Sequence, residues 1–171
     1  LFGYVKNVVV KNLTLENGGV KELFHGSKTE NWFSIINNGL WLCPENNGVA
    51  ICGKAFGHGI YFAPLAKKSI GYTSGFGSYW ANGDQAKGYL AIFEVATGEI
   101  YDIYGEGNGV PDNYHELQEK HPGADCTWAF SRAKYSNAYL ANEEVIVYTD
   151  GSVQEGSLKS EDEKLSQCTI K

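Results

Sequence analysis

Three short segments of the chain carry the side chains best suited to chemistry. The first reads Leu23-Phe24-His25-Gly26-Ser27, a strand-like run that delivers a histidine directly before a glycine. Such a pair places an imidazole hydrogen-bond donor beside a backbone that a ligand can approach closely. A histidine at the end of a strand is also typical of a satisfied structural residue, so this segment alone leaves both interpretations open.

The second segment is more specific. Residues 53–63 read G-K-A-F-G-H-G-I-Y-F-A, so glycines flank an apolar strand with two adjacent aromatics, and Lys68, Ser69 and Tyr72 follow. Tyr61 on the strand and Tyr72 on the next helix can face each other across a planar ring, an arrangement that contributes about 1 kcal/mol beyond area burial. The alternative is that both tyrosines are core aromatics.

The third segment places two carboxylates before a β-branched run. Residues 142–148 read N-E-E-V-I-V-Y. Because side chains alternate along a strand, only one of Glu143 and Glu144 can face a given pocket. For either glutamate, the alternative is a solvated residue at the end of a strand.

In this order, the three segments closely resemble the catalytic domain of poly(ADP-ribose) polymerases, within the diphtheria-toxin-like ADP-ribosyltransferases. The matching motifs are H-G-S, then G-x-x-F-G-x-G-I-Y-F-A with K-S and a later Tyr, then N-E-x-x-I-V-Y. The resemblance extends from the first predicted strand to Tyr148. It implies an α+β fold in which two antiparallel β-sheets and a few short helices form a split cleft for NAD. It also implies transfer of ADP-ribose from NAD to a protein side chain, with release of nicotinamide.

The resemblance also implies the roles of individual residues. The family's His-Tyr-Glu set maps onto His25, Tyr61 and Glu144, and Glu144 is selected over Glu143 because the family glutamate directly precedes a short strand that ends in Tyr. His25 is expected to bind the adenosine-side ribose 2′-hydroxyl. The other expected NAD contacts are Gly26 and Ser69 at the carboxamide, Tyr61 and Tyr72 at the nicotinamide ring, Ser27, Asn31 and Trp41 at the adenosine half, and Phe62, Ala63 and Lys68 nearby, with Lys68 on the acceptor side.

The expected reaction develops positive charge on a sugar. Cleavage of the bond between ribose and nicotinamide gives an oxocarbenium-like centre, which a carboxylate bound to the nicotinamide-ribose 2′-hydroxyl stabilises. Removing such a group commonly lowers the rate by about a hundredfold or more. The same carboxylate can orient the acceptor nucleophile. This chemistry needs NAD as a substrate and no metal, and the four cysteines lack metal-ligand spacing.

Several elements must position these groups. Residues 1–150 are predicted to form the catalytic domain, and the polar residues 151–171 a disordered tail. A helix capped by Thr29 is expected to carry Trp32, Phe33 and Ile36 on one face and to end at Gly39. Other helices are predicted over 65–72 and 112–120, strands over 5–15, 20–24, 59–63, 89–95, 100–104 and 144–148, and loops over 43–57 and 74–87.

Composition narrows the class of protein. The 171 residues and 43% hydrophobic content fit one domain with a real core. A net charge of −6 without a basic patch argues against direct nucleic-acid binding. No apolar stretch is long enough to span a bilayer. We expect an intracellular monomer, cytoplasmic or nuclear, with reduced cysteines, although a bridge between Cys43 and Cys52 remains possible. The expected acceptor is another protein or the chain itself.

Alternatives to protein ADP-ribosylation remain at this stage. One is a catalytically inactive module that binds NAD or ADP-ribose, and another is an NAD glycohydrolase. The intact His25, Tyr61 and Glu144 argue against an inactive module. An RNA 2′-phosphotransferase ranks low because that chemistry uses arginines and the chain has only Arg132. Polymer and single-unit transfer both remain open: the third-position glutamate is associated with polymerases, but an acidic domain is poorly suited to bind an anionic chain end.

Overall fold

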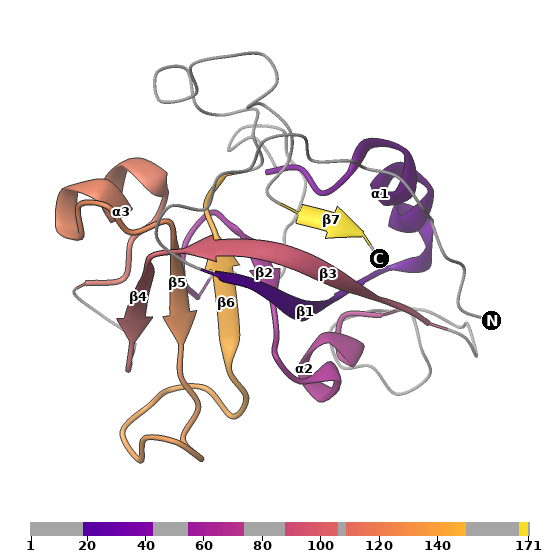
Figure 1. Ribbon diagram of the computed structural model, residues 1–171. Helices are drawn as coiled ribbons and strands as arrows, with labels where there is room; N and C mark the ends of the chain where they lie inside the picture. The colour runs from indigo at the N-terminus through magenta and orange to yellow at the C-terminus, as the bar shows by residue number, and fades with distance from the viewer. Residues whose placement is uncertain (1–18, 43–54, 74–87, 106–108, 150–167, 171) are drawn as a thin grey trace.

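Two crossing β-sheets organise the molecule. The computed structural model describes residues 19–42, 55–73, 88–105, 109–149 and 168–170 (Figure 1). The first sheet has the order β1-β3-β7, all antiparallel, with bounds Gly19–Ser27, Tyr89–Gly98 and Cys168–Ile170. The second has the order β2-β6-β5-β4, with bounds Ile60–Phe62, Glu144–Val147, Cys126–Ala129 and Ile100–Ile103. The long strands of the first sheet run across those of the second (Figure 1).

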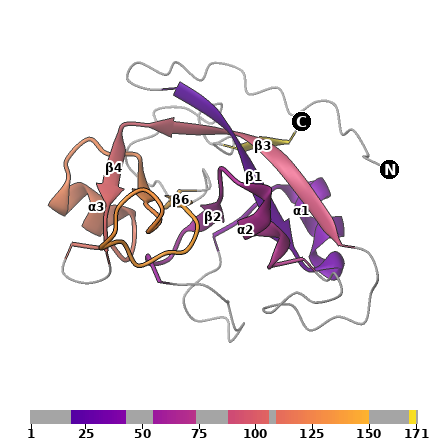
Figure 2. The same cartoon turned by 90° about the horizontal axis from the view of Figure 1, so that it is seen from below.

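Short helices flank the sheets. A 3-10 turn, η1, spans Thr29–Asn31, and the helices are α1 (Trp32–Asn38), α2 (Ala66–Ile70) and α3 (Tyr114–Lys120). α3 lies beside β4 and β5, while α1 and α2 lie on the opposite side of the molecule (Figures 1 and 2). In the part of the chain that the structure describes, no helix has the length and apolar character needed to cross a bilayer.

The predicted fold class is confirmed: the structure is α+β, with two sheets and a few short helices. One pairing differs from the antiparallel sheets that were expected, because β4 and β5 are parallel. The chain leaves β4, forms α3 and returns to start β5 at the same end, and a crossover connection of this kind is what a parallel pair requires.

The central strand β6 is buried on both faces. Val145 and Val147 pack with Leu23 and Phe93 in a core between the two sheets. Ile146 lies on the other face, in a second core that includes Leu117 of α3. The alternation has a period of two, as a strand requires, so each face of β6 contributes to a different core.

The prediction for the first helix is wrong in two respects. The α-helix begins at Trp32, after the 3-10 turn that contains Thr29, and not directly after Thr29. Trp32 and Ile35 are buried, whereas Phe33 is 81% exposed and Ile36 is 48% exposed. The indole of Trp32 donates a hydrogen bond to the Ser27 carbonyl at 3.1 Å, which fixes the rotation of this short helix.

The remaining elements follow the predictions with shifted ends. Gly39 ends α1 with a φ of 81°, as expected of a C-terminal glycine. α3 begins at Tyr114, directly after its N-cap residue Asn113. The Asn113 side chain accepts a hydrogen bond from the Glu116 amide at 3.0 Å. Within the predicted disordered tail, Cys168–Ile170 forms β7 on the edge of β3, a strand that the sequence did not predict. Other predictions fall on residues that the structure does not describe. These are the predicted strand over 5–15, the loop residues 43–54 and 74–87, and residues 150–167 and 171.

Candidate functional site

A pair of backbone hydrogen bonds joins the two sheets at the candidate site. Phe24 of β1 and Ala63, directly after β2, exchange both bonds, at 2.8 and 2.9 Å. This bridge brings His25 next to Tyr61, and the Nδ1 atom of His25 lies 2.9 Å from the Tyr61 carbonyl oxygen. Because a carbonyl can only accept, Nδ1 carries the proton. In the neutral ring, Nε2 is therefore an acceptor for a ligand hydroxyl.

The surroundings of His25 favour the neutral ring. Its imidazole contacts Phe62, Phe93 and Trp32, with ring centroids 5.7, 5.8 and 6.4 Å apart. Burial lowers the pKa of His25, and this effect outweighs the hydrogen bond to Tyr61, which acts in the opposite direction. The imidazole donor that the sequence indicated is therefore committed to the protein backbone, and the group left for a ligand is the Nε2 acceptor.

Gly26 allows the helix α2 to approach β1. A Cβ atom at Gly26 would collide with the carbonyl oxygen of Ser69. Ser69 is 4% exposed, and its hydroxyl donates a hydrogen bond to the Phe24 carbonyl at 2.9 Å. The hydroxyl oxygen retains lone pairs that can accept an N–H group, such as that of a carboxamide. Gly26 and Ser69, predicted to act together, are thus in direct contact.

The Tyr61 ring is fixed through its hydroxyl. The hydroxyl accepts from the Phe56 amide at 3.0 Å and donates to the Gly57 carbonyl at 2.8 Å. Gly57 has a φ of 81°, and a Cβ there would collide with the backbone of residues 111 and 112. The Tyr148 hydroxyl donates to the Phe56 carbonyl at 2.8 Å from the core side. Burial raises the pKa of Tyr61, so its hydroxyl stays protonated.

Strand alternation places Glu144 on the same face as Tyr61. Tyr61 pairs with Ile146 across β2 and β6, and Glu144 lies two residues before Ile146. The neighbouring Glu143 faces the other way, where its carboxylate accepts a hydrogen bond from the Trp128 indole at 2.9 Å. The geometry thus distinguishes the two glutamates: only Glu144 shares a face with Tyr61.

Glu144 forms an ion pair with Lys68 of α2. The Nζ and Oε1 atoms are 3.0 Å apart, and the side chains are 20% and 6% exposed, respectively. Burial raises the pKa of Glu144, opposed by the charge and hydrogen bond of Lys68 and by a hydrogen bond from Tyr72. Burial alone would lower the pKa of Lys68, but Glu144 and Tyr72 together raise it. Lys68 therefore keeps its positive charge, and this charge favours the ionised form of Glu144 against the larger opposing effect of burial.

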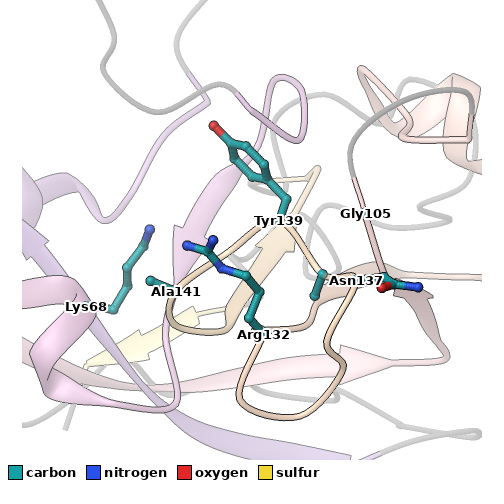
Figure 3. A pocket seen from close by; sticks show the side chains of 7 residues that line it. Lys68, Gly105, Arg132, Asn137, Tyr139 and Ala141 are labelled. Carbon is teal, nitrogen blue, oxygen red and sulfur yellow. The ribbon is translucent and has the colours of Figure 1, made fainter.

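A pocket of about 650 Å³ opens on the side of Lys68. Its lining comes from α2, from Gly105 after β4 and from the loop between β5 and β6. Figure 3 labels Lys68, Gly105, Arg132, Asn137, Tyr139 and Ala141. The sequence predicted Lys68 here and missed the others. The one available signal was that Arg132 is the only arginine of the chain.

The other predicted NAD contacts differ in how far their side chains are exposed. At the end of β1, the Asn31 side-chain amide donates to the Ser27 hydroxyl at 2.9 Å, so the two predicted adenosine contacts lie together. Trp41, beyond α1, is 72% exposed. Phe62 and Ala63 are each 1% exposed, so their side chains belong to the core rather than to a ligand surface.

The described residues contain no group of three or more His, Cys, Asp or Glu that could hold a metal ion.

Cys126, which lies within the described residues, is poorly suited to act as a nucleophile. Cys126 is buried in the core between the sheets, and burial raises the pKa of its thiol to about 12. Its sulfur donates to the Thr97 carbonyl at 3.1 Å. A thiol with a raised pKa is a poor nucleophile. Cys43 and Cys52, considered as a possible disulfide, lie outside the described residues.

One protein family matches most of this chain, and individual relatives match about half of it. Residues 6–167 match the family "Poly(ADP-ribose) polymerase catalytic domain". The chain is 38% identical to human poly [ADP-ribose] polymerase 2 over 99 residues, which are 58% of this chain and 15% of that protein. It is 35% identical over 81 residues, 47% of the chain, to polymerase 2 of Arabidopsis thaliana and polymerase 1 of Gallus gallus, covering 12% and 7% of those proteins. The chain thus corresponds to a small part of each relative.

Proposed function

Because this chain belongs to the family of poly(ADP-ribose) polymerase catalytic domains, we propose that it transfers ADP-ribose from NAD to a protein side chain, with release of nicotinamide. Members of the family use NAD as a substrate and act on protein acceptors. One observation supports the proposal above all others: Glu144 shares a strand face with Tyr61 and is ion-paired to Lys68 at 3.0 Å.

The donor half of the site is formed by β1, β2 and α2. We assign the nicotinamide ring to the space beside the fixed Tyr61 ring and the partly exposed Tyr72. The contact between Gly26 and Ser69 offers a backbone and a hydroxyl to the carboxamide. His25 offers its Nε2 acceptor to a ribose hydroxyl, because its Nδ1 is bound to the Tyr61 carbonyl.

In the proposed reaction, Glu144 stabilises charge on the sugar. The bond between the ribose and the nicotinamide nitrogen breaks, and its electron pair leaves with nicotinamide. The acceptor oxygen or nitrogen forms the new bond to the same ribose carbon and releases its proton, if it carries one, to solvent. A buried carboxylate stabilises the developing positive charge more effectively than a solvated one. Lys68 serves this step indirectly, because its positive charge 3.0 Å away favours the carboxylate form of Glu144.

The adjacent glutamates provide a matched test. Glu144→Gln should reduce nicotinamide release and label transfer from NAD by about a hundredfold or more. Glu143→Gln makes the same chemical change one residue away, on the face that binds Trp128, and should retain transfer. NAD should still raise the melting temperature of the Glu144→Gln variant, since most of the expected donor contacts involve other residues.

The outcomes separate the alternatives. Mass spectrometry of the protein and of added acceptors after treatment with NAD identifies the modified residues and the length of the attached chain. If the unmodified chain neither releases nicotinamide nor transfers label from NAD, it is an inactive binding module. Nicotinamide release without label transfer would identify an NAD glycohydrolase. Loss of transfer in Glu143→Gln but not in Glu144→Gln would refute the assignment of the catalytic glutamate.

A further inference from the structure

The pocket beside Lys68 has an unused positive charge. Figure 3 shows the guanidinium of Arg132 and the ammonium of Lys68 pointing toward the same space, with Tyr139 across from them. Lys68 already neutralises Glu144 across 3.0 Å. Arg132 forms no ion pair or side-chain hydrogen bond within the part of the chain that the structure describes. The pocket wall therefore carries about one net positive charge, on a protein whose net charge is −6.

The backbone holds Arg132 in place. Its amide donates to the Leu140 carbonyl at 2.8 Å, which connects the two ends of the loop between β5 and β6. The Ser131 carbonyl accepts from the amides of Lys134 and Tyr135, both at 3.0 Å. Ser131 and Leu140 are buried on either side of this connection. An anchored loop of this kind fixes the backbone from which the exposed Arg132 side chain extends, so binding has to order only the side chain.

Aromatic packing reinforces the loop from beneath. The Tyr135 ring lies against Phe130 and Tyr104, with centroids 5.1 and 4.8 Å apart. Tyr104 and Phe130 also stack with centroids 5.4 Å apart. Tyr104, Tyr135 and Tyr139 remain 40–52% exposed, and Tyr139 lines the pocket, so aromatic surface lies next to Arg132. Exposed aromatic rings and one guanidinium are a combination that suits a peptide segment.

We propose that Arg132 determines acceptor specificity by binding a carboxylate side chain of the acceptor protein, close to the residue that is modified. The proposal rests on the proposed function of Glu144. We assign the carboxylate bound by Arg132 to recognition and not to nucleophilic attack, because the nucleophile must reach Glu144, whose ion-pair partner is Lys68. A guanidinium binds a carboxylate through two parallel hydrogen bonds. The single net charge of the pocket matches one carboxylate better than the two charges of a diphosphate.

The test uses two peptides that differ at one position. Both carry the same modifiable residue, flanked in one peptide by glutamate and in the other by glutamine, which keeps the shape and removes the charge. For the glutamate peptide, Arg132→Gln should raise KM about tenfold, the loss expected for a charge-assisted hydrogen bond. The KM for the glutamine peptide should not change. Lys134→Gln, an exposed lysine on the same loop that lies over the Phe130 ring, is the matched control and should retain the preference.

Binding distinguishes a failure of this proposal from a failure of the proposed function. Fluorescence anisotropy of the two labelled peptides with the unmodified chain and with Arg132→Gln measures recognition without turnover. A preference for the glutamate peptide that Arg132→Gln abolishes supports the proposal even if no nicotinamide is released. Equal effects of Arg132→Gln on both peptides overturn it. Competition by free ADP-ribose that requires Arg132, with no preference between the peptides, also overturns it and identifies a diphosphate ligand.

Discussion

The ion pair between Lys68 and Glu144 makes a sharp prediction about pH. Lys68→Met removes the positive charge but keeps most of the aliphatic side chain. The buried carboxylate then loses the interaction that opposes its burial, so the pKa of Glu144 rises further. If the carboxylate form is required for transfer, the rising limb of the pH–rate profile must move to higher pH.

The size of the effect follows from the geometry. Two unit charges 3.0 Å apart attract by about 5 kcal/mol at an effective dielectric constant near 20. Desolvation of the ammonium and its 20% exposure reduce the net contribution to about 1.5–3 kcal/mol. That free energy corresponds to a roughly 10- to 100-fold change in the proton affinity of Glu144. On the rising limb, kcat/KM of Lys68→Met should therefore fall by about the same factor.

The assay measures nicotinamide release at fixed ionic strength across the pH range in which the protein remains folded. Lys67→Met provides the control, because Lys67 is the exposed neighbour on α2 and its removal changes the net charge by the same amount. Its profile should overlie that of the unmodified chain. The rate of Lys68→Met should approach the unmodified rate at high pH, where Glu144 ionises without help.

Two results would refute this reasoning. A rate that stays depressed by the same factor at every pH would show that Lys68 contributes to the reaction itself and not to the ionisation of Glu144. A profile identical to that of the unmodified chain would show that the ion pair does not control the carboxylate. Circular dichroism of each variant excludes misfolding as the cause.

Three further predictions concern the donor site. Gly26→Ala should abolish the NAD-induced rise in melting temperature and destabilise the fold by about 1–3 kcal/mol, because the new Cβ collides with the Ser69 carbonyl. Gly105→Ala is the control, because the atom nearest to its new Cβ is 3.9 Å away, and it should change neither property. Equal effects of the two substitutions would refute the steric explanation. Tyr148→Phe should lower the free energy of unfolding in urea by about 1–3 kcal/mol, because it leaves a buried carbonyl without its donor; an unchanged midpoint would contradict this. The pKa of His25 is lowered by burial, so the midpoint of its NMR titration should lie below the usual histidine value of 6.5. A midpoint at or above 6.5 would contradict this.

The choice between Glu143 and Glu144 was predictable from the sequence for a physical reason. Side chains alternate along a strand regardless of what surrounds it, so two adjacent glutamates must separate onto opposite faces. The structure confirms that separation, with Trp128 on one side and Lys68 on the other. The same rule would have corrected the expectation for Phe62, which follows Tyr61 and therefore points into the core.

Features that depend on distant partners were not predictable. The seven residues of α1 span too few turns for a clear period, so a hydrogen bond from Trp32 to Ser27 decides which face is buried. The strand β7 exists because β3 presents a free edge far away in the sequence. The pocket around Arg132 is shaped by a loop with no periodicity, which a hydrogen bond between Arg132 and Leu140 closes.

The two-sided burial of β6 also has a consequence for the dynamics of the site. A strand shared by both cores cannot open unless both cores loosen, so its amides should exchange with solvent only through global unfolding. Glu144 begins this strand and follows the surface loop that carries Arg132. The candidate catalytic carboxylate thus lies where a strand protected by both cores meets an anchored surface loop.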